Sequence, residues 1–406
     1  MVRIDEFAVE RWMDDYEQSA KYNLAETCCA SISLDDLIKL SGSSVTLTDI
    51  ISPSRKLIYG DIPGSEGLRS RIGDLYASGS CEPLSPQDVL VANGAIQANF
   101  LALYTCVGPG DHVICHYPTY QQLYTVPTSL GAEVSLWKAK EESDWRMDLD
   151  ELRGMIKANT KLIIINNPQN PTGAVQSRAV LQGVVDIAQE HDITILSDEV
   201  YRPLFHSLDA DEQENPPSIL SLGYEKTIAT GSMSKAFSLA GIRLGWIATR
   251  SSEIMRACYS CRDYTTISVS QLDDQVATFA LTKPTLTALL QRNVELARKN
   301  LQVLRAFLEE YSWAFRWVAP KAGTTLLVKM LDRQGKVIDD VEFCKRLQGE
   351  TGVMFVPASR CFGGGVDFRG YIRIGYVSEH EVLVDGLQAL ERFMLDGYGK
   401  LPLVSA

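Results

Sequence analysis

Lys235 is the residue of this sequence best suited to covalent chemistry. It lies in the segment G-S-M-S-K-A-F, residues 231–237, among small hydroxyl residues and a phenylalanine. A half-buried lysine in this setting would have a lowered pKa, and its neutral amine could attack a carbonyl group. Arg243 follows shortly afterwards, before an apolar stretch, and could hold a phosphate through its planar guanidinium. The alternative is that Lys235 is an exposed loop lysine.

Two further segments place polar side chains after apolar runs. Asp198 directly follows I-T-I-L-S, where burying a carboxylate is costly unless a cation pairs with it. Tyr201, three residues later, can face the same site, although Asp198 could also act only as a helix cap. Asn170 lies in N-P-Q-N-P-T-G, residues 167–173, whose Asn-Pro steps impose an extended backbone. Its amide could enter a cleft, or the segment could be a plain turn.

A phosphate seat could lie at residues 93–97, where a helical pattern begins. The segment N-G-A-I-Q follows the apolar run V-L-V-A. Small residues at a helix N-terminus leave backbone N–H groups free, and such groups bind anions. The signal is weak by itself, because many turns look like this one. Tyr120 also follows a strand-like run, and it could stack on a planar ligand or belong to the core.

One cofactor would use all of these side chains. Pyridoxal phosphate needs a lysine for its aldehyde and an acid opposite its pyridine nitrogen. It also needs donors to its ring hydroxyl, an aromatic group over the ring and a cationic cup for the phosphate. The combination therefore predicts pyridoxal 5'-phosphate as the cofactor.

The spacing of these segments indicates the fold that would position them. Short β-branched runs alternate with helical patterns, and strands are expected at residues 89–92, 112–115, 133–136, 161–166, 193–197, 227–230 and 244–248. Strands separated by long helices indicate an α/β fold, here a mainly parallel seven-stranded sheet with helices on both faces. Ligands of such sheets bind at the carboxyl ends of the strands, which is where the polar residues lie.

The pattern changes in the last third of the chain. Helical periodicity dominates residues 283–311, and shorter strands are expected at 324–329, 353–356 and 371–374, before a closing helix at 379–395. This order is typical of a small α+β domain. We therefore expect a large cofactor-binding domain at 46–285, a smaller α+β domain at 286–406, and an N-terminal arm at 1–45 that also contributes to the small domain.

Composition disfavours several classes of protein. The 406 residues carry a net charge of −12, which argues against nucleic acid and anionic membranes as partners. No apolar run approaches the roughly 18 to 20 residues of a membrane span. The irregular spacing of the nine cysteines and the charged start of the sequence indicate reduced thiols in a cytoplasmic protein. The lone C-x-x-C at 258–261 has no second ligand pair, so no metal site is expected.

Three motifs together resemble a known family. The segment S-M-S-K-A-F-S-L-A-G-I-R-L-G, residues 232–245, is similar to the lysine signature of class I/II aminotransferases, which are fold type I pyridoxal phosphate enzymes. N-P-Q-N-P-T-G and D-E-V-Y match that family in order and spacing, and the resemblance runs from about Tyr59 to Arg373. It implies that Lys235 binds the cofactor aldehyde, that Asp198 pairs with the ring nitrogen, and that Tyr201 assists catalysis.

The same resemblance implies roles for the remaining residues. Asn170 and Tyr201 would hydrogen-bond the ring hydroxyl, Tyr120 would stack on the ring, and the phosphate would lie among Ala95, Ile96, Ser232, Ser234 and Arg243. Tyr59 would reach the phosphate of a partner subunit, which implies a homodimer with shared active sites. Arg373 in Y-I-R-I-G would bind the substrate carboxylate, with Asn170 beside it. By alternation along a strand, Arg373 could instead face solvent.

The resemblance leaves the reaction open. We expect first an aminotransferase that moves an amino group from an amino acid to a 2-oxo acid. The segments at 356–363 and 368–376 also resemble specialised-metabolism branches, so a lyase that cleaves a C–S bond by β-elimination, or a cyclase, is the second expectation. Oxidative variants form a further class, and a non-catalytic sensor is disfavoured because the chain lacks a basic DNA-binding module. Residues 23–28 lie where relatives cover the substrate, and we expect them to shape specificity.

Overall fold

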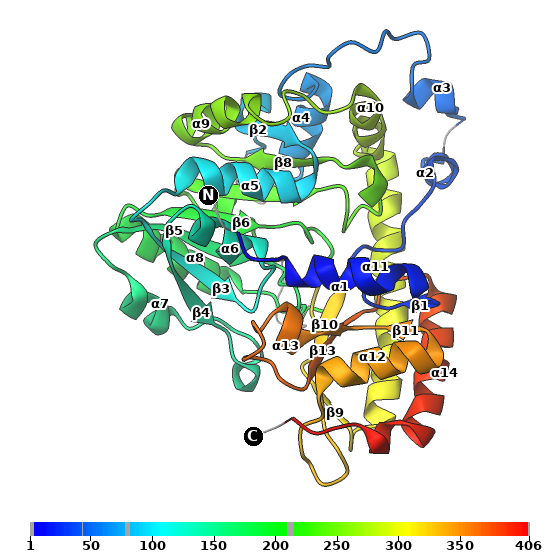
Figure 1. Cartoon of the computed structure of the whole chain (residues 1–406). Helices are drawn as coiled ribbons and strands as arrows, with labels where there is room; N and C mark the ends of the chain where they lie inside the picture. Colours follow the sequence, from blue (N-terminus) through cyan, green and yellow to red (C-terminus); the bar gives the residue numbers. More distant parts are fainter. Residues whose placement is uncertain (1–3, 43, 78–81, 209–214, 405–406) are drawn as a thin grey trace.

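A seven-stranded sheet forms the centre of the computed structural model, which describes residues 4–42, 44–77, 82–208 and 215–404 (Figure 1). The sheet has the order β2-β8-β7-β6-β5-β3-β4 and consists of β2 (Val89–Ala92), β3 (His112–Tyr117), β4 (Glu133–Lys138), β5 (Thr160–Asn166), β6 (Thr194–Asp198), β7 (Thr227–Ser232) and β8 (Gly245–Ala248). Strand β8 pairs antiparallel with β2 and β7, and the other neighbouring strands of this sheet pair in parallel. The expected mainly parallel α/β fold is confirmed.

Both faces of this sheet are buried, because successive residues of its strands enter different hydrophobic clusters. Leu162 and Ile164 of β5 belong to one cluster, and Ile163 and Ile165 belong to the other. The first face is covered by α5 (Gly94–Cys106), α6 (Gln122–Ser129) and α9 (Ser252–Asp263), and the second by α4 (Glu66–Asp74), α7 (Leu149–Met155), α8 (Arg178–Glu190) and α10 (Gln271–Ala280). This two-sided burial explains why the central strands are almost entirely apolar.

A second, antiparallel sheet is built mainly from the last third of the chain. Its order is β12-β13-β10-β9, from β9 (Phe315–Trp317), β10 (Thr325–Met330), β12 (Val356–Pro357) and β13 (Tyr371–Gly375). Around it lie α11 (Lys283–Glu310), α12 (Asp340–Thr351), α13 (Ala358–Cys361) and α14 (His380–Asp396). The long helix α11 contacts α10 beside the large sheet and also β9 and α14, so it connects the two sheets (Figure 1).

The N-terminal segment joins the second sheet's side of the molecule. β1 (Tyr22–Asn23) pairs in parallel with β11 (Val353–Met354), and α1 (Ala8–Tyr16) buries Trp12, whose Nε1–H donates to the Phe355 carbonyl at 2.9 Å. The other short elements are η1 (Glu17–Ser19), α2 (Leu34–Leu40), α3 (Leu47–Ile50), η2 (Pro86–Asp88), η3 (Glu141–Ser143), η4 (Ile219–Ser221), η5 (Ala240–Ile242) and η6 (Tyr398–Lys400). The start of the chain is therefore joined to residues 353–355, near the end of the chain, in a separate two-stranded sheet and through one side-chain hydrogen bond.

The strand register brings the expected site residues to one edge. Asn166 and Asp198 are paired across β5 and β6, and Asp198 pairs with Thr230 of β7, two residues before Ser232. Parallel strands end on the same side, so the loops that follow them converge there. Within the described residues, no helix has the length and apolar character needed to cross a bilayer, and no group of side chains could hold a metal ion. The described cysteines are all free thiols.

Candidate active site

A cavity of about 520 Å³ opens at this edge of the large sheet and is closed on its other side by β13 and the N-terminal segment. Its lining includes all but one of the predicted site residues: Ala95, Ile96, Tyr120, Asn170, Asp198, Tyr201, Ser232, Ser234, Lys235, Arg243 and Arg373. Tyr59 is the exception, since its side chain is 74% exposed on a separate surface beside residues 268–272. One chain alone does not bring Tyr59 to the cavity.

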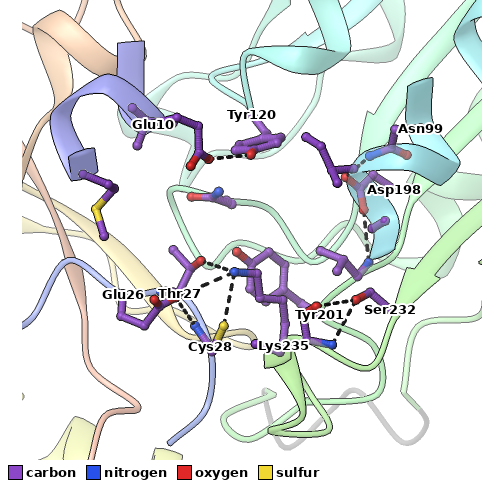
Figure 2. Close-up of a pocket in the computed structure, with 18 of the residues that line it drawn as sticks. Glu10, Glu26, Thr27, Cys28, Asn99, Tyr120, Asp198, Tyr201, Ser232 and Lys235 are labelled. Atoms are coloured by element: carbon purple, nitrogen blue, oxygen red, sulfur yellow. Dashed lines mark hydrogen bonds and ion pairs between the residues drawn. The ribbon is translucent and has the colours of Figure 1, made fainter. Parts of the chain in front are cut away.

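Asp198 ends β6 as a buried carboxylate that two amide groups hold in place. Asn99 Nδ2 donates to Oδ2 at 3.0 Å, and the Val200 N–H donates to Oδ1 at 3.1 Å (Figure 2). Burial raises the pKa of Asp198 to about 6, partly opposed by these hydrogen bonds. Residues 200–203 form turns, so Asp198 does not cap a helix. No described lysine or arginine forms an ion pair with it, and the carboxylate can therefore receive a cationic ligand atom.

Asn99 is a site residue that the sequence analysis missed. It lies fully buried on α5, and its side-chain oxygen accepts from Thr230 Oγ1 at 2.6 Å while its amide donates to Asp198. This chain of hydrogen bonds fixes the carboxylate's orientation. The available signal was a single asparagine within the otherwise apolar helix sequence A-N-F-L-A-L.

The amine of Lys235 lies against the N-terminal segment rather than in an apolar pocket. Its Nζ donates to Thr27 Oγ1 at 2.6 Å and to Cys28 Sγ at 3.4 Å, and it lies 3.8 Å from Glu26 Oε1 (Figure 2). The expected lowered pKa is wrong. Burial lowers the pKa of Lys235, but Cys28, Tyr201 and Glu26 together raise it above its ordinary value.

Glu26 is the charged partner in this group. Burial raises its pKa, but Lys235 and the hydrogen bonds from Cys28 and Thr27 prevail and lower the pKa to about 2, so Glu26 is ionised at neutral pH. The Cys28 thiol is neutral there, because burial raises its pKa to about 11. The segment that contains Glu26, Thr27 and Cys28 was expected to cover the substrate. Its contact with Lys235 was not foreseen.

The start of α5 and the loop of Arg243 form a narrow cradle. A Cβ added at Gly245 would lie 2.4 Å from the Gly94 carbonyl carbon and 2.6 Å from the Ala95 nitrogen. One added at Gly94, where φ is +77°, would lie 2.8 Å from Arg243 Nη2. Glycine at both positions therefore lets two backbones and a guanidinium approach each other closely. Beside them Ser232 Oγ and Ser234 Oγ are 2.7 Å apart. Helix N–H groups, hydroxyls and a cation make this a suitable seat for a phosphate.

Arg373 is buried in the cavity wall, so the alternative that it faces solvent is wrong. Its side chain is only 3% exposed, with Nη1 donating to Asn170 Oδ1 at 3.3 Å and Nη2 to the Ala25 carbonyl at 2.8 Å. Its Nε has no hydrogen-bond partner, and no described carboxylate forms an ion pair with it. Burial lowers the pKa of Arg373. A buried guanidinium without an anion is a binding point for a carboxylate.

Tyr120 and α1 complete the wall opposite Lys235. The Tyr120 hydroxyl donates to Glu10 Oε1 at 2.6 Å, and its ring lies 4.8 Å from that of Phe7 (Figure 2). The Ala8 N–H also donates to Gln121 Oε1 at 2.8 Å. Helix α1 is thereby tied to the loop that follows β3. The sequence analysis gave no role to α1.

These residues fit pyridoxal phosphate. Asp198 offers a buried anion for the ring nitrogen, the cradle between Gly94 and Gly245 admits a phosphate, and Lys235 presents an amine in the same cavity. The individual roles of these side chains stay predictions.

The raised pKa of Asp198 predicts a pH-dependent effect on the cofactor-free protein. The pKa of Asp198 is about 6 in the folded protein and about 4 in the unfolded chain. The contribution of this carboxyl to the free energy of unfolding is therefore fully present below about pH 4 and is lost as the pH rises through about 6. Asp198→Asn should therefore gain up to about 3 kcal/mol over wild type above pH 6 and nothing below pH 4. Urea unfolding at both pH values measures this. The exposed Asp186→Asn is the control, and an equal gain for both variants would contradict the prediction.

Comparison with known proteins agrees with this site. The family profile "Aminotransferase class I and II" matches residues 46–395. Aspartate aminotransferase of Thermotoga maritima is 29% identical over 331 residues, which cover 81% of this chain and 80% of the relative. Capreomycidine synthase of Streptomyces vinaceus is 26% identical over 385 residues, covering 94% and 92%.

The solved structures include a similar protein from Streptococcus suis 89-1591, described as a PLP-dependent aminotransferase. It superposes with a TM-score of 0.87 at 39% identity and covers 97% of this chain and 98% of its own. The profile match spans most of the chain and contains the lysine, aspartate and asparagine motifs described above. The chain therefore belongs to the class I and II aminotransferase family, whose cofactor is pyridoxal phosphate.

Proposed function

We propose that this chain is a pyridoxal phosphate-dependent aminotransferase that moves the amino group of an amino acid to a 2-oxo acid. The observation that carries the proposal is the placement of Lys235 and Arg373 in one cavity. Arg373 is a buried guanidinium without an anionic partner, and Lys235 presents an amine beside the same space. An amino acid with its carboxylate on Arg373 would place its α-carbon within the cavity that Lys235 also lines.

The roles of the side chains follow from what each can hold. When bound, pyridoxal phosphate supplies a ring that withdraws electrons from the substrate's α-carbon. Asp198 would keep the ring nitrogen protonated, because an ion pair in a desolvated site is strong. The Lys235 amine would take the proton from the substrate's α-carbon and deliver it to the C4′ carbon of the cofactor. Arg373 would fix the carboxylate and so orient the bond that breaks.

We also propose a homodimer with shared active sites in the cytoplasm. Leu57, Ile58 and Tyr59 are more than 70% exposed, and Tyr264 is 93% exposed. Apolar side chains exposed next to each other, as at 57–59, are typical of a protein interface. A partner's surface would cover them and place Tyr59 near the other subunit's phosphate seat.

The free thiols of the described cysteines support the cytoplasmic location. The two sheets support a division into a large domain at 46–285 and a small domain at 286–406, to which part of 1–45 also contributes.

A lyase or cyclase is the second candidate. The similarity to capreomycidine synthase covers 94% of this chain, whereas the similarity to aspartate aminotransferase covers 81%. The same Lys235 proton transfer would serve both reactions, and what differs is whether the substrate carries a leaving group. The distinction therefore lies in the products.

The products of a single half-reaction test the proposal. Holoenzyme given excess amino acid and no 2-oxo acid should stop after one turnover, with the cofactor in its amine form and one equivalent of oxo acid released. A lyase would continue to turn over and release ammonia. Absorbance spectra and oxo-acid assay measure the outcome. Sustained turnover without an amino acceptor would reject the aminotransferase and favour the second candidate.

The role of Arg373 predicts a loss that a second cation does not restore. Arg373→Lys should lower kcat/KM, because an ammonium cannot make the planar two-point contact to a carboxylate. The decrease should correspond to a loss of roughly 3 to 5 kcal/mol of transition-state binding free energy. Steady-state kinetics with the best amino donor measures this. Arg369→Lys, at an exposed position, is the matched control. Similar kinetics for both variants would remove Arg373 from the site.

The shared site predicts complementation between two defective subunits. Tyr59→Phe and Lys235→Ala proteins, mixed and reassociated, should form mixed dimers in which one site has both native residues. With random pairing, about a quarter of the wild-type activity should return at limiting cofactor. Activity after mixing measures this, and sedimentation gives the assembly state. A fully active monomer would refute the dimer.

A further inference from the structure

The outer wall of the cavity comes from the N-terminal segment and combines apolar and acidic side chains. Val9 and Met13, one helical turn apart on α1, both line the cavity. Glu10, Glu17 and Glu26 line it as well, from α1, η1 and the segment after β1 (Figure 2 labels Glu10 and Glu26). This part of the wall has carboxylates and no cationic side chain among the described lining residues.

Glu17 is affected by the charges of the other two carboxylates. Burial raises the pKa of Glu17, and the nearby Glu26, Glu10 and Asp14 raise it further. Glu10 and Glu17 form no ion pair with any described residue. Each has one oxygen in a hydrogen bond within the chain, from Tyr120 and from Asn23 at 3.4 Å. A cationic ligand group would relieve this repulsion.

Among the described residues, Glu26 forms an ion pair with Lys235 alone, at 3.8 Å. Lys235 is the residue that the proposed function assigns to the cofactor. Bound to the cofactor, its nitrogen is no longer a free ammonium facing Glu26. The carboxylate, whose side chain is 42% exposed, then faces the cavity without its partner.

An independent observation gives the other end of the ligand. Arg373 is buried with its Nε unpartnered, and it lines the same cavity as the three glutamates. Glu10, Glu26 and Arg373 therefore face the same space, and the charges of both glutamates raise the pKa of Arg373 against the effect of its burial. A molecule with a carboxylate at Arg373 and a cation at the glutamates would satisfy both ends.

The apolar part of the wall fits the stem of such a molecule. Phe7, Val9 and Met13 line the cavity together with the acidic side chains. Long side chains that end in a cation place their methylene groups on apolar surface and their charged head among polar groups. A second carboxylate at this position would instead add a negative charge beside three others.

We propose that the substrate is an amino acid whose side chain ends in a cationic nitrogen group, an ammonium or a guanidinium, and that Glu10, Glu17 and Glu26 select it. The inference rests on the proposed function, which places the α-carboxylate at Arg373. It gives the N-terminal segment the task of discriminating between side chains.

Matched pairs of amino donors test the proposal on the holoenzyme. Arginine and citrulline have nearly the same shape but differ in charge, and lysine and norleucine differ in the same way. The cationic member of each pair should react with a kcat/KM at least about tenfold higher, and aspartate and glutamate should react most slowly. Equal or faster reaction of citrulline and norleucine, or a preference for glutamate, would overturn the proposal.

Variants separate a local contact from the general acidity of the chain. Glu10→Gln and Glu17→Gln should each lower the arginine-to-citrulline ratio of kcat/KM by about three- to tenfold. Asp15→Asn makes the same change of charge on α1, but Asp15 lies outside the cavity and faces Arg360 at 3.8 Å. This control should change the ratio less than about twofold. An equal effect of all three variants would overturn the assignment.

Binding of an unreactive ligand tests the inference without catalysis. 5-Guanidinopentanoate has the carboxylate and the guanidinium of arginine but no α-amine, and 5-ureidopentanoate is its neutral match. Calorimetry on the holoenzyme should show tighter binding of the guanidinium compound, and equal affinity would overturn the inference. The two proposals can fail separately. If no amino acid gives the half-reaction, the proposed function fails, whereas a half-reaction confined to neutral or acidic donors overturns only the inference on the substrate.

Discussion

Burial of ionisable groups at one edge of a parallel sheet is the constraint on which this structure depends. Asp198, Lys235 and Arg373 are brought together there, and each departs from its ordinary pKa. Asp198 accepts hydrogen bonds from neutral donors and Arg373 donates to neutral acceptors, and neither forms an ion pair with another described residue. Such an arrangement is unfavourable in an empty protein and favourable around a ligand that supplies the missing charges. The rest of the fold holds these three groups in place.

The large sheet and the small sheet contribute different parts of the site. The loops after β5 and β7 supply Asn170 and Lys235, and the last residue of β6 is Asp198. These side chains face the expected cofactor, while β13 supplies Arg373 for the expected substrate. Helix α11 contacts elements of both sheets, and α1 is hydrogen-bonded to Gln121 on one side and to the Phe355 carbonyl on the other. Helix α1 is therefore hydrogen-bonded both to the loop that follows β3 and to the segment that follows β11.

The comparisons fit this division. The family profile begins at residue 46, so the segment that carries Glu10, Glu17 and Glu26 lies outside it. The similarity to capreomycidine synthase and the superposition on the Streptococcus suis aminotransferase both extend over nearly the whole chain. A shared cofactor site with a separate N-terminal wall allows one chemistry to serve different side chains.

The sequence by itself determined three things: the mainly parallel sheet, the polar residues that follow its strands, and the family. Alternating and helical periodicities report local burial, and the residues within each of the lysine, aspartate and asparagine motifs lie close together in the sequence. Only the tertiary structure decided the contacts between distant segments. Thr27 meets Lys235 across 208 positions, Glu10 meets Tyr120 across 110, and Asn99 meets Asp198 across 99. The direction in which the pKa of Lys235 departs from its ordinary value depends on such a contact, because Glu26 lies far from Lys235 in the sequence. Local residue types set how a segment folds, but the field at a buried charge is set by whatever the whole chain packs against it.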